Sequence, residues 1–158
     1  LPRGREQWLR LMSLLAVVTL RSYGGVIMSF PWRAGAWAWI AALCVVGGKC
    51  IGGFASDRFG EVRSATVTLS AAAAALIFSA FPLPGALGLL LFNMSMPVTL
   101  YAARDILREG RATAFGLLTL GLFLGMLPAF SGASGSGQDY AMICLISIML
   151  IRVGVGKR

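Results

Sequence analysis

Long apolar stretches alternate with short polar separators along the whole chain. The separators contain proline, glycine, serine and charged residues, which are typical of turns. Each apolar stretch is close to the roughly 20 residues that a helix needs to cross a bilayer. We therefore predict an all-α fold, a single transmembrane domain over residues 1–158 with six spans at about 8–30, 35–56, 64–81, 85–106, 113–130 and 140–155.

The composition agrees with a multi-pass integral membrane protein. Hydrophobic residues make up 58% of the chain and charged residues 13%, about half of the roughly 25% that is usual in soluble domains. The chain has no histidine, which excludes most zinc sites and the serine–histidine hydrolases. Cys44, Cys50 and Cys144 form no CxxC pair, so we interpret them as small buried hydrophobic residues. We expect no metal, no cofactor and no enzymatic activity.

The basic residues indicate a topology. Of the 14 Lys and Arg residues, eleven fall on one predicted side of the membrane, Arg33 alone falls on the other, and Arg21 and Lys49 lie within spans. The eleven are Arg3, Arg5, Arg10, Arg58, Arg63, Arg104, Arg108, Arg111, Arg152, Lys157 and Arg158. The positive-inside rule then places both termini in the cytoplasm, and we expect the inner membrane of a bacterial cell. Since these charges flank apolar spans, the net charge of +8 does not predict nucleic-acid binding.

A charged turn between the second and third spans is the most informative motif. It contains Gly53, Asp57, Arg58, Gly60 and Arg63 in the pattern G-x-x-x-D-R-x-G-x-x-R. We expect Gly53 to allow close approach of a neighbouring backbone and Gly60 to adopt the positive φ of a tight reversal. Asp57 can accept hydrogen bonds at a helix end or pair with an arginine. The two arginines can reach headgroups or carboxylates such as Asp105 and Glu109. A basic loop that only obeys the positive-inside rule is the alternative.

This turn resembles the signature loop of the major facilitator superfamily, which follows the second helix of a six-helix half. Glu61 and Val62 stand where the family often has basic residues. In the fifth span, the spacing of Gly121, Gly125 and Pro128 is similar to an antiporter signature, with the proline displaced by two positions.

The resemblance implies that the chain is one half of a transporter, built from two inverted three-helix repeats. We assign it to the C-terminal half. The charged turn would be a conformational latch, and the partner would be a second six-helix half in the same polypeptide, a separate chain or a second copy.

The resemblance also implies that the first and fourth spans line a substrate cavity. Arg21 lies within the first span, where a charge is costly unless it meets water or a partner. Asn93 precedes Pro97 by four residues, and proline cannot donate to the carbonyl of residue 93, which predicts a broken helix beside a cavity. We predict substrate contacts at Arg21, Asn93, Tyr101 and Lys49. Alternatively, Arg21 pairs with the second half, Asn93 bonds across helices, and Lys49 reaches the headgroups.

No Asp or Glu lies deep within a predicted span. The resemblance implies secondary active transport of a small solute by alternating access. Because the predicted intramembrane charges are cationic, we expect this solute to be anionic or polar-acidic. The alternatives are a stand-alone six-span protein that binds and regulates other membrane proteins, or a transporter remnant without transport. An enzyme of lipid metabolism is a weaker alternative, because clustered carboxylates and histidines are missing.

Overall fold

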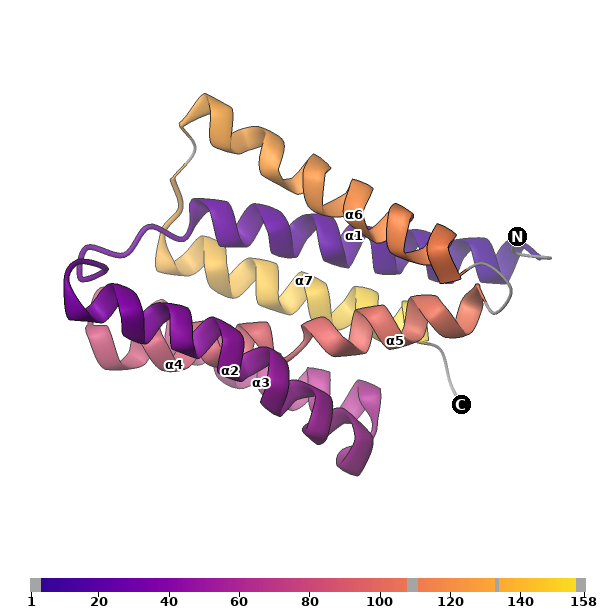
Figure 1. Ribbon diagram of the computed structural model, residues 1–158, viewed down its shortest axis with the longest axis horizontal. Helices are drawn as coiled ribbons and strands as arrows, with labels where there is room; N and C mark the ends of the chain where they lie inside the picture. The colour runs from indigo at the N-terminus through magenta and orange to yellow at the C-terminus, as the bar shows by residue number, and fades with distance from the viewer. Residues whose placement is uncertain (1–3, 108–110, 133, 156–158) are drawn as a thin grey trace.

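Every regular element of the described residues is a helix (Figure 1). The computed structural model describes residues 4–107, 111–132 and 134–155. Its elements are α1 (Arg5–Ile27), α2 (Ala36–Phe59), α3 (Glu61–Ile77), α4 (Pro82–Asn93), α5 (Met96–Ile106), α6 (Arg111–Met126), the 3₁₀ helix η1 (Leu127–Ser131) and α7 (Gly137–Val155).

Five helical segments are long and apolar enough to cross a membrane: α1, α2, α4 joined to α5, α6 joined to η1, and α7. The remaining helix, α3, has 17 residues and is about 25 Å long at 1.5 Å per residue, slightly less than a hydrocarbon core of about 30 Å. Large apolar side chains cover the outside of the bundle, with Phe54 and Phe130 at least 80% exposed. These features are compatible with an integral membrane protein.

The long segments run back and forth along one axis. The first turn of α1 and the last turn of α7 lie toward the same end of the molecule, which we call the terminal end, and the connection between α1 and α2 lies at the opposite, distal end (Figure 1). The predicted bounds differ from the observed helix ends by a few residues. In two places, residues that we expected to form a turn between spans belong to helices instead.

The predicted turn at Asp57–Arg63 is helical except at Gly60. Asp57 and Arg58 belong to the last turn of α2, and Arg63 belongs to the first turn of α3. Gly60 has a φ of 86°, as predicted, and this conformation reverses the chain at a single residue. Likewise, α4 begins at Pro82, three residues before the predicted start of the fourth span at residue 85, because proline is well tolerated in the first turn of a helix.

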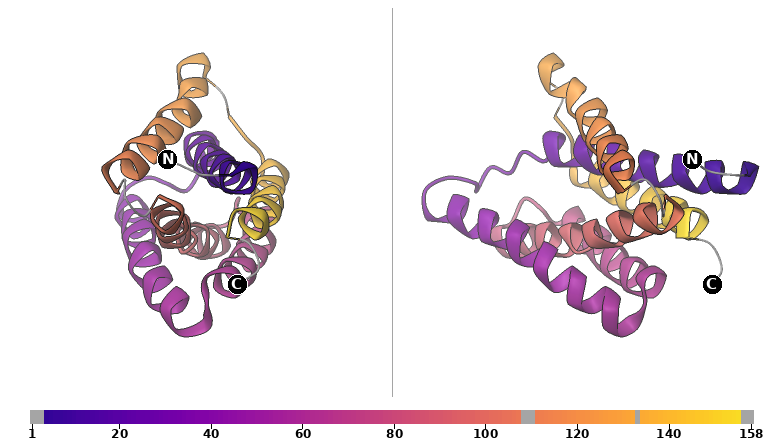
Figure 2. Two further views of the ribbon diagram at one scale, coloured as in Figure 1. Left: turned by 90° about the vertical axis from the view of Figure 1, so that its right-hand side faces the viewer. Right: turned by 45° about the vertical axis from the view of Figure 1, so that its right-hand side comes forward.

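The helices form two groups of three consecutive segments. The first group is α1, α2 and α3, and the second is α4 joined to α5, α6 joined to η1, and α7. Each group packs largely against the other. In the first group, α1 packs mainly against α6 and α7 of the second group. In the second group, α4 packs mainly against α2 and α3 of the first, and α3 and α7 pack against each other. Figure 2 shows the helices end-on, with α1 beside α6 and α7, and α2 and α3 around the segment formed by α4 and α5. The leading helix of each group is therefore held by the following helices of the other.

Pairs of glycines four residues apart form the tightest of these contacts. On α2, a Cβ added to Gly48 would meet the carbonyl oxygen of Leu90, and one on Gly52 would overlap the backbone of Met94. Small residues at this spacing let two helix backbones approach closely. Gly53 makes no such contact within the described residues, since a Cβ there meets nothing within 4 Å.

The glycine pair on α6 has the same role toward α1. A Cβ on Gly125 would overlap the carbonyl oxygen of Thr19, and one on Gly121 would lie 2.8 Å from Cδ1 of Leu15. The hydroxyl of Ser22 on α1 also donates to the carbonyl oxygen of Leu122 on α6, at 2.6 Å. Both glycine pairs therefore join the second helix of one group to the leading helix of the other.

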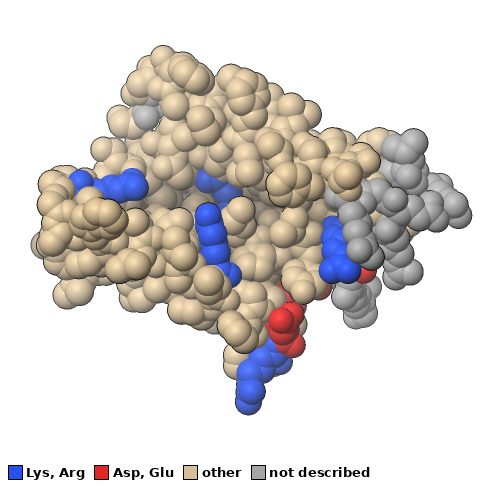
Figure 3. Space-filling view, viewed as in Figure 1, with Lys and Arg blue, Asp and Glu red and all other residues tan. Residues whose placement is uncertain are grey.

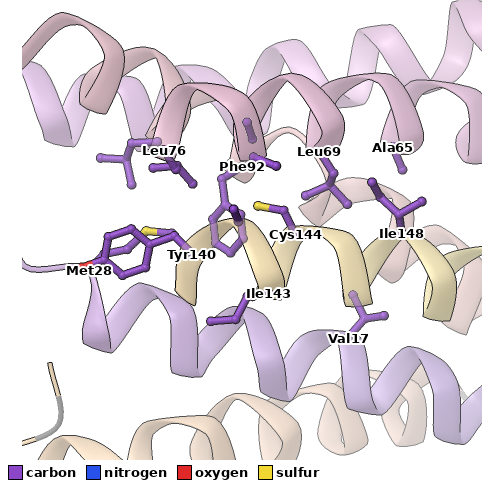
Figure 4. Packing of buried hydrophobic residues seen from close by; sticks show 14 of the residues in the cluster. Val17, Met28, Ala65, Leu69, Leu76, Phe92, Tyr140, Ile143, Cys144 and Ile148 are labelled. Atoms are coloured by element: carbon purple, nitrogen blue, oxygen red, sulfur yellow. The ribbon is translucent and has the colours of Figure 1, made fainter. Parts of the chain in front are cut away.

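Helix α7 supplies much of the buried core (Figure 4). Its residues Tyr140, Cys144 and Ile148 lie among apolar side chains of α1, α3 and α4. Cys144 is fully buried, as predicted, whereas Cys44 is half-buried and Cys50 is exposed. The exposed thiol corrects our expectation that all three cysteines are buried.

Aromatic side chains fix the distal end of the bundle. The rings of Phe30 and Trp32 stack with centroids 5.0 Å apart, and Trp37 lies edge-on to Trp32. The indole nitrogen of Trp32 donates to the carbonyl oxygen of Ser79, at 2.8 Å. The hydroxyl of Tyr140 lies 2.9 Å from the carbonyl oxygen of Ile27. These contacts anchor the connection between α1 and α2.

We expect Gly52→Val to destabilise the protein and the matched Gly53→Val variant to leave its stability nearly unchanged. Valine at position 52 would overlap the Met94 backbone, and overpacking of this kind costs about 1–3 kcal/mol or more. Thermal unfolding in detergent would measure the difference. Equal midpoints for the two variants would contradict the assigned contact.

Candidate functional site

The fourth apolar segment is broken in its middle. Helix α4 ends at Asn93 and α5 begins at Met96, so the break predicted from Pro97 is confirmed. The Asn93 side chain is buried, and its amide nitrogen donates to the carbonyl oxygen of Leu89, at 2.8 Å. One N–H and the amide oxygen of Asn93 remain for other partners.

Arg21 lies in the C-terminal half of α1 and faces the broken segment. Its guanidinium carbon lies 5.5 Å from the centroid of the Phe92 ring on α4, within the range of a cation–π contact. Its Nε is buried and has no hydrogen-bond partner among the described residues. A buried guanidinium N–H without a partner is costly, so this group is available to a ligand or a further polar partner.

Arg21 and Asn93 line a cavity of about 450 Å³ between α1, α2, α5 and α6, which we call the central cavity. Figure 3, viewed from the same side as Figure 1, shows basic side chains in a hollow at the middle of the molecule. The cavity is lined by Val18, Arg21, Ser22, Lys49, Asn93, Met96, Thr99, Leu100, Phe115, Leu118, Thr119 and Leu122.

Three of the four predicted substrate residues therefore meet in one place. Arg21 comes from α1, Lys49 from α2 and Asn93 from the end of α4. Tyr101 does not line the central cavity; its side chain is on α5 and is 48% exposed. The structure brings together the two cations and the amide but not the phenol.

The wall chemistry of the central cavity favours an anion. Arg21 and Lys49 contribute positive charge, and no carboxylate is among the lining residues in the part of the chain that the structure describes. The hydroxyls of Ser22, Thr99 and Thr119 donate to the backbone carbonyls of Leu122, Met96 and Phe115. These hydroxyls therefore offer acceptor lone pairs to a ligand, while the cations and the Asn93 amide offer donors.

Helix α6 contributes one wall of the central cavity that the sequence alone did not indicate. Phe115, Leu118, Thr119 and Leu122 all face it. Their positions follow the i, i+3, i+4, i+7 spacing of a single helix face. That signal was present in the sequence, but an apolar helix face is equally typical of core packing or lipid contact.

The residues of the predicted latch cluster around Gly60. Asp57, Arg58 and Arg63 are exposed. Asp57 has neither a hydrogen bond nor an ion pair in the part of the chain that the structure describes. Glu109, one of the carboxylates predicted to meet these arginines, lies outside the described residues. The geometry leaves the Asp57 carboxylate accessible to a further partner.

No group of three or more potential metal ligands occurs among the residues that the structure describes. Comparison with known proteins gives no match to a family model, a curated protein or a solved structure. The functional argument therefore depends on the chemistry of the cavity and on the packing around it.

Proposed function

We propose that this protein is one six-helix half of a transporter of the major facilitator type, and that it moves a small organic anion by alternating access. The observation that carries the proposal is the central cavity, where Arg21 and Lys49 converge and none of the described lining residues is a carboxylate. Intramembrane cations are rare and commonly mark a substrate or ion pathway. An anion in this cavity would compensate both charges.

The exchange of packing partners supports an arrangement of two three-helix repeats. Helix α1 packs against α6 and α7, and α4 packs against α2 and α3. The glycine pairs on α2 and α6 take equivalent positions in this scheme. In the proposal, α3 is the third of six spans, with the bilayer locally thinner or the helix extended by the apolar residues after Ile77.

Arg21 would bind the anionic group of the substrate. Its buried Nε lacks a partner among the described residues, and a carboxylate can accept two hydrogen bonds from a guanidinium. Lys49 would contribute a second, more flexible donor from α2. Asn93, at the broken helix, would orient the substrate through its free amide N–H and oxygen.

A second six-helix half would cover the open side of the central cavity. The exposed Lys49 and Thr119 lie on that side, and polar side chains of this kind are unfavourable against lipid. Rocking of the two halves would expose the substrate to each side of the membrane in turn. The Asp57 carboxylate, exposed at the terminal end, would bind a group of the second half in one of the two conformations.

The charge distribution supports a cytoplasmic location for the terminal end. Among the described residues, Arg5, Arg10, Arg58, Arg104 and Arg152 lie at or near helix ends of the terminal side, and Arg33 lies at the distal end. The positive-inside rule favours this orientation in a bacterial inner membrane. Both termini would then be cytoplasmic.

We expect Arg21→Gln to reduce anion uptake at least tenfold. The loss of a charge-assisted hydrogen bond of about 1.5–3 kcal/mol corresponds to a factor of ten or more in binding. Uptake of labelled carboxylates and inorganic anions would be measured in proteoliposomes of the protein purified from its own membranes. Arg21→Lys is the matched control and should retain part of the activity. Unchanged substrate affinity in Arg21→Gln would contradict the proposal.

The latch hypothesis predicts that Asp57→Asn impairs transport without unfolding the protein. The substitution keeps the shape of the side chain but removes the charge that would pair with a cation of the second half. Glu6→Gln, which removes an exposed carboxylate from the first turn of α1, is the control. Uptake rates and thermal unfolding of both variants would be compared. A wild-type rate in Asp57→Asn would exclude the latch.

A further inference from the structure

A second cavity of about 230 Å³ adjoins the central cavity and extends toward the distal end. Arg21 and Asn93 line both cavities. The second one, which we call the end cavity, is lined by Arg21, Gly25, Met28, Arg33, Val45, Leu89, Phe92 and Asn93. It therefore joins the exposed Arg33 to the buried nitrogen of Arg21.

Arg33 is an exception to the charge pattern of the molecule. It lies in the connection between α1 and α2, at the distal end, whereas most basic residues of the described part of the chain lie near the terminal end. Under the positive-inside rule, a basic residue on the opposite side is disfavoured. A specific role at this position would explain its presence.

Hydrogen bonds and ring contacts hold the backbone around Arg33 in place. Its N–H donates to the carbonyl oxygen of Phe30, at 3.1 Å. The preceding Trp32 stacks on Phe30, bonds to Ser79 and covers Gly85. These contacts hold the Arg33 backbone at the edge of the end cavity.

The electrostatics of the end cavity are uniformly positive. Two guanidinium groups line it, and no carboxylate lines it within the described ranges 4–107, 111–132 and 134–155. Asp139, a carboxylate near the distal end, accepts hydrogen bonds from the N–H and hydroxyl of Ser136, both at 2.8 Å, and does not line the cavity. The two cations are thus not neutralised by an acidic side chain within the cavity.

We propose that Arg33 forms a second anion-binding subsite, from which a small carboxylate passes through the end cavity to Arg21. This inference rests on the proposed function and deepens it by naming the route and the class of ligand. The cavity volume of about 230 Å³ suits a carboxylate of a few carbon atoms. Positive walls of low dielectric concentrate anions and raise their rate of association, and salt weakens the effect.

The test uses the tryptophans beside Arg33 as reporters. Trp8 lies near the terminal end, and Trp32, Trp37 and Trp39 all follow within the distal connection and the start of α2. A Trp8→Phe variant in phosphatidylcholine nanodiscs therefore reports on the distal end alone. Its fluorescence would be quenched with iodide, a small anion, and with neutral acrylamide. Acetate and succinate would compete with iodide at constant ionic strength.

We expect acetate or succinate to protect against iodide quenching in a saturable manner. Arg33→Gln should weaken this protection at least tenfold and leave acrylamide quenching unchanged. The control is Arg152→Gln, which removes an exposed positive charge from the last turn of α7 at the other end of the bundle; it should behave like the parent. The absence of saturable protection, or equal protection in Arg33→Gln, would overturn the subsite. In that case Arg33 only binds headgroup phosphate.

A transport measurement separates the subsite from the proposed function. Arg33→Gln should raise the KM for substrate added at the distal side about tenfold, with the KM from the terminal side unchanged. If Arg33→Gln loses the protection against iodide quenching but the parent protein transports no anion, the result would support the subsite and refute the transporter. Uptake that depends on Arg21 but is indifferent to Arg33 would refute the subsite and leave the transporter intact.

Discussion

The guanidinium of Arg21 is the constraint on which the rest of the structure depends. A positive charge inside an apolar bundle must meet water, a counter-ion or an aromatic face. Here the Phe92 ring lies 5.5 Å away, but Nε finds no hydrogen-bond partner among the described residues. The surrounding helices do not pack closely around this side chain. The α4 helix ends at Asn93, and Arg21 lines two cavities.

The glycine pairs explain how such space can exist in a stable bundle. Helix association in a membrane depends on close van der Waals contact because lipid is as apolar as the side chains. Gly48 and Gly52 bring α2 against the broken segment, and Gly121 and Gly125 bring α6 against α1. These two contacts are tight, and they fix α2 and α6 as walls on either side of the central cavity.

The sequence predicted the helices well because apolar length and turn residues are local signals. It also predicted the positive φ of Gly60 and the break before Pro97, since both follow from the covalent structure of a single residue. It failed where the answer depends on neighbours. The close backbone contact is at Gly52 and not at Gly53, a difference set by the rotation of α2 against α4.

The candidate site was predictable only in part for the same reason. Arg21, Lys49 and Asn93 are conspicuous because each is a polar group within an apolar span. Tyr101 was also conspicuous, but the orientation of α5 after the break directs it away from the central cavity. Thr119 was missed because a threonine in an apolar helix satisfies itself by bonding to the preceding turn, here to Phe115.

The reactivity of a cysteine introduced in place of Thr119 tests most directly whether the central cavity is a water-filled, cationic passage. Cys44 and Cys50 would be replaced by serine, and Thr119→Cys would be introduced in the membrane-embedded protein. Thiol reagents of opposite charge would then be compared. We predict that the anionic reagent modifies the introduced thiol faster than the cationic one, and that Arg21→Gln removes the difference. Modification only by a lipid-soluble, uncharged reagent would contradict an anion pathway through this cavity.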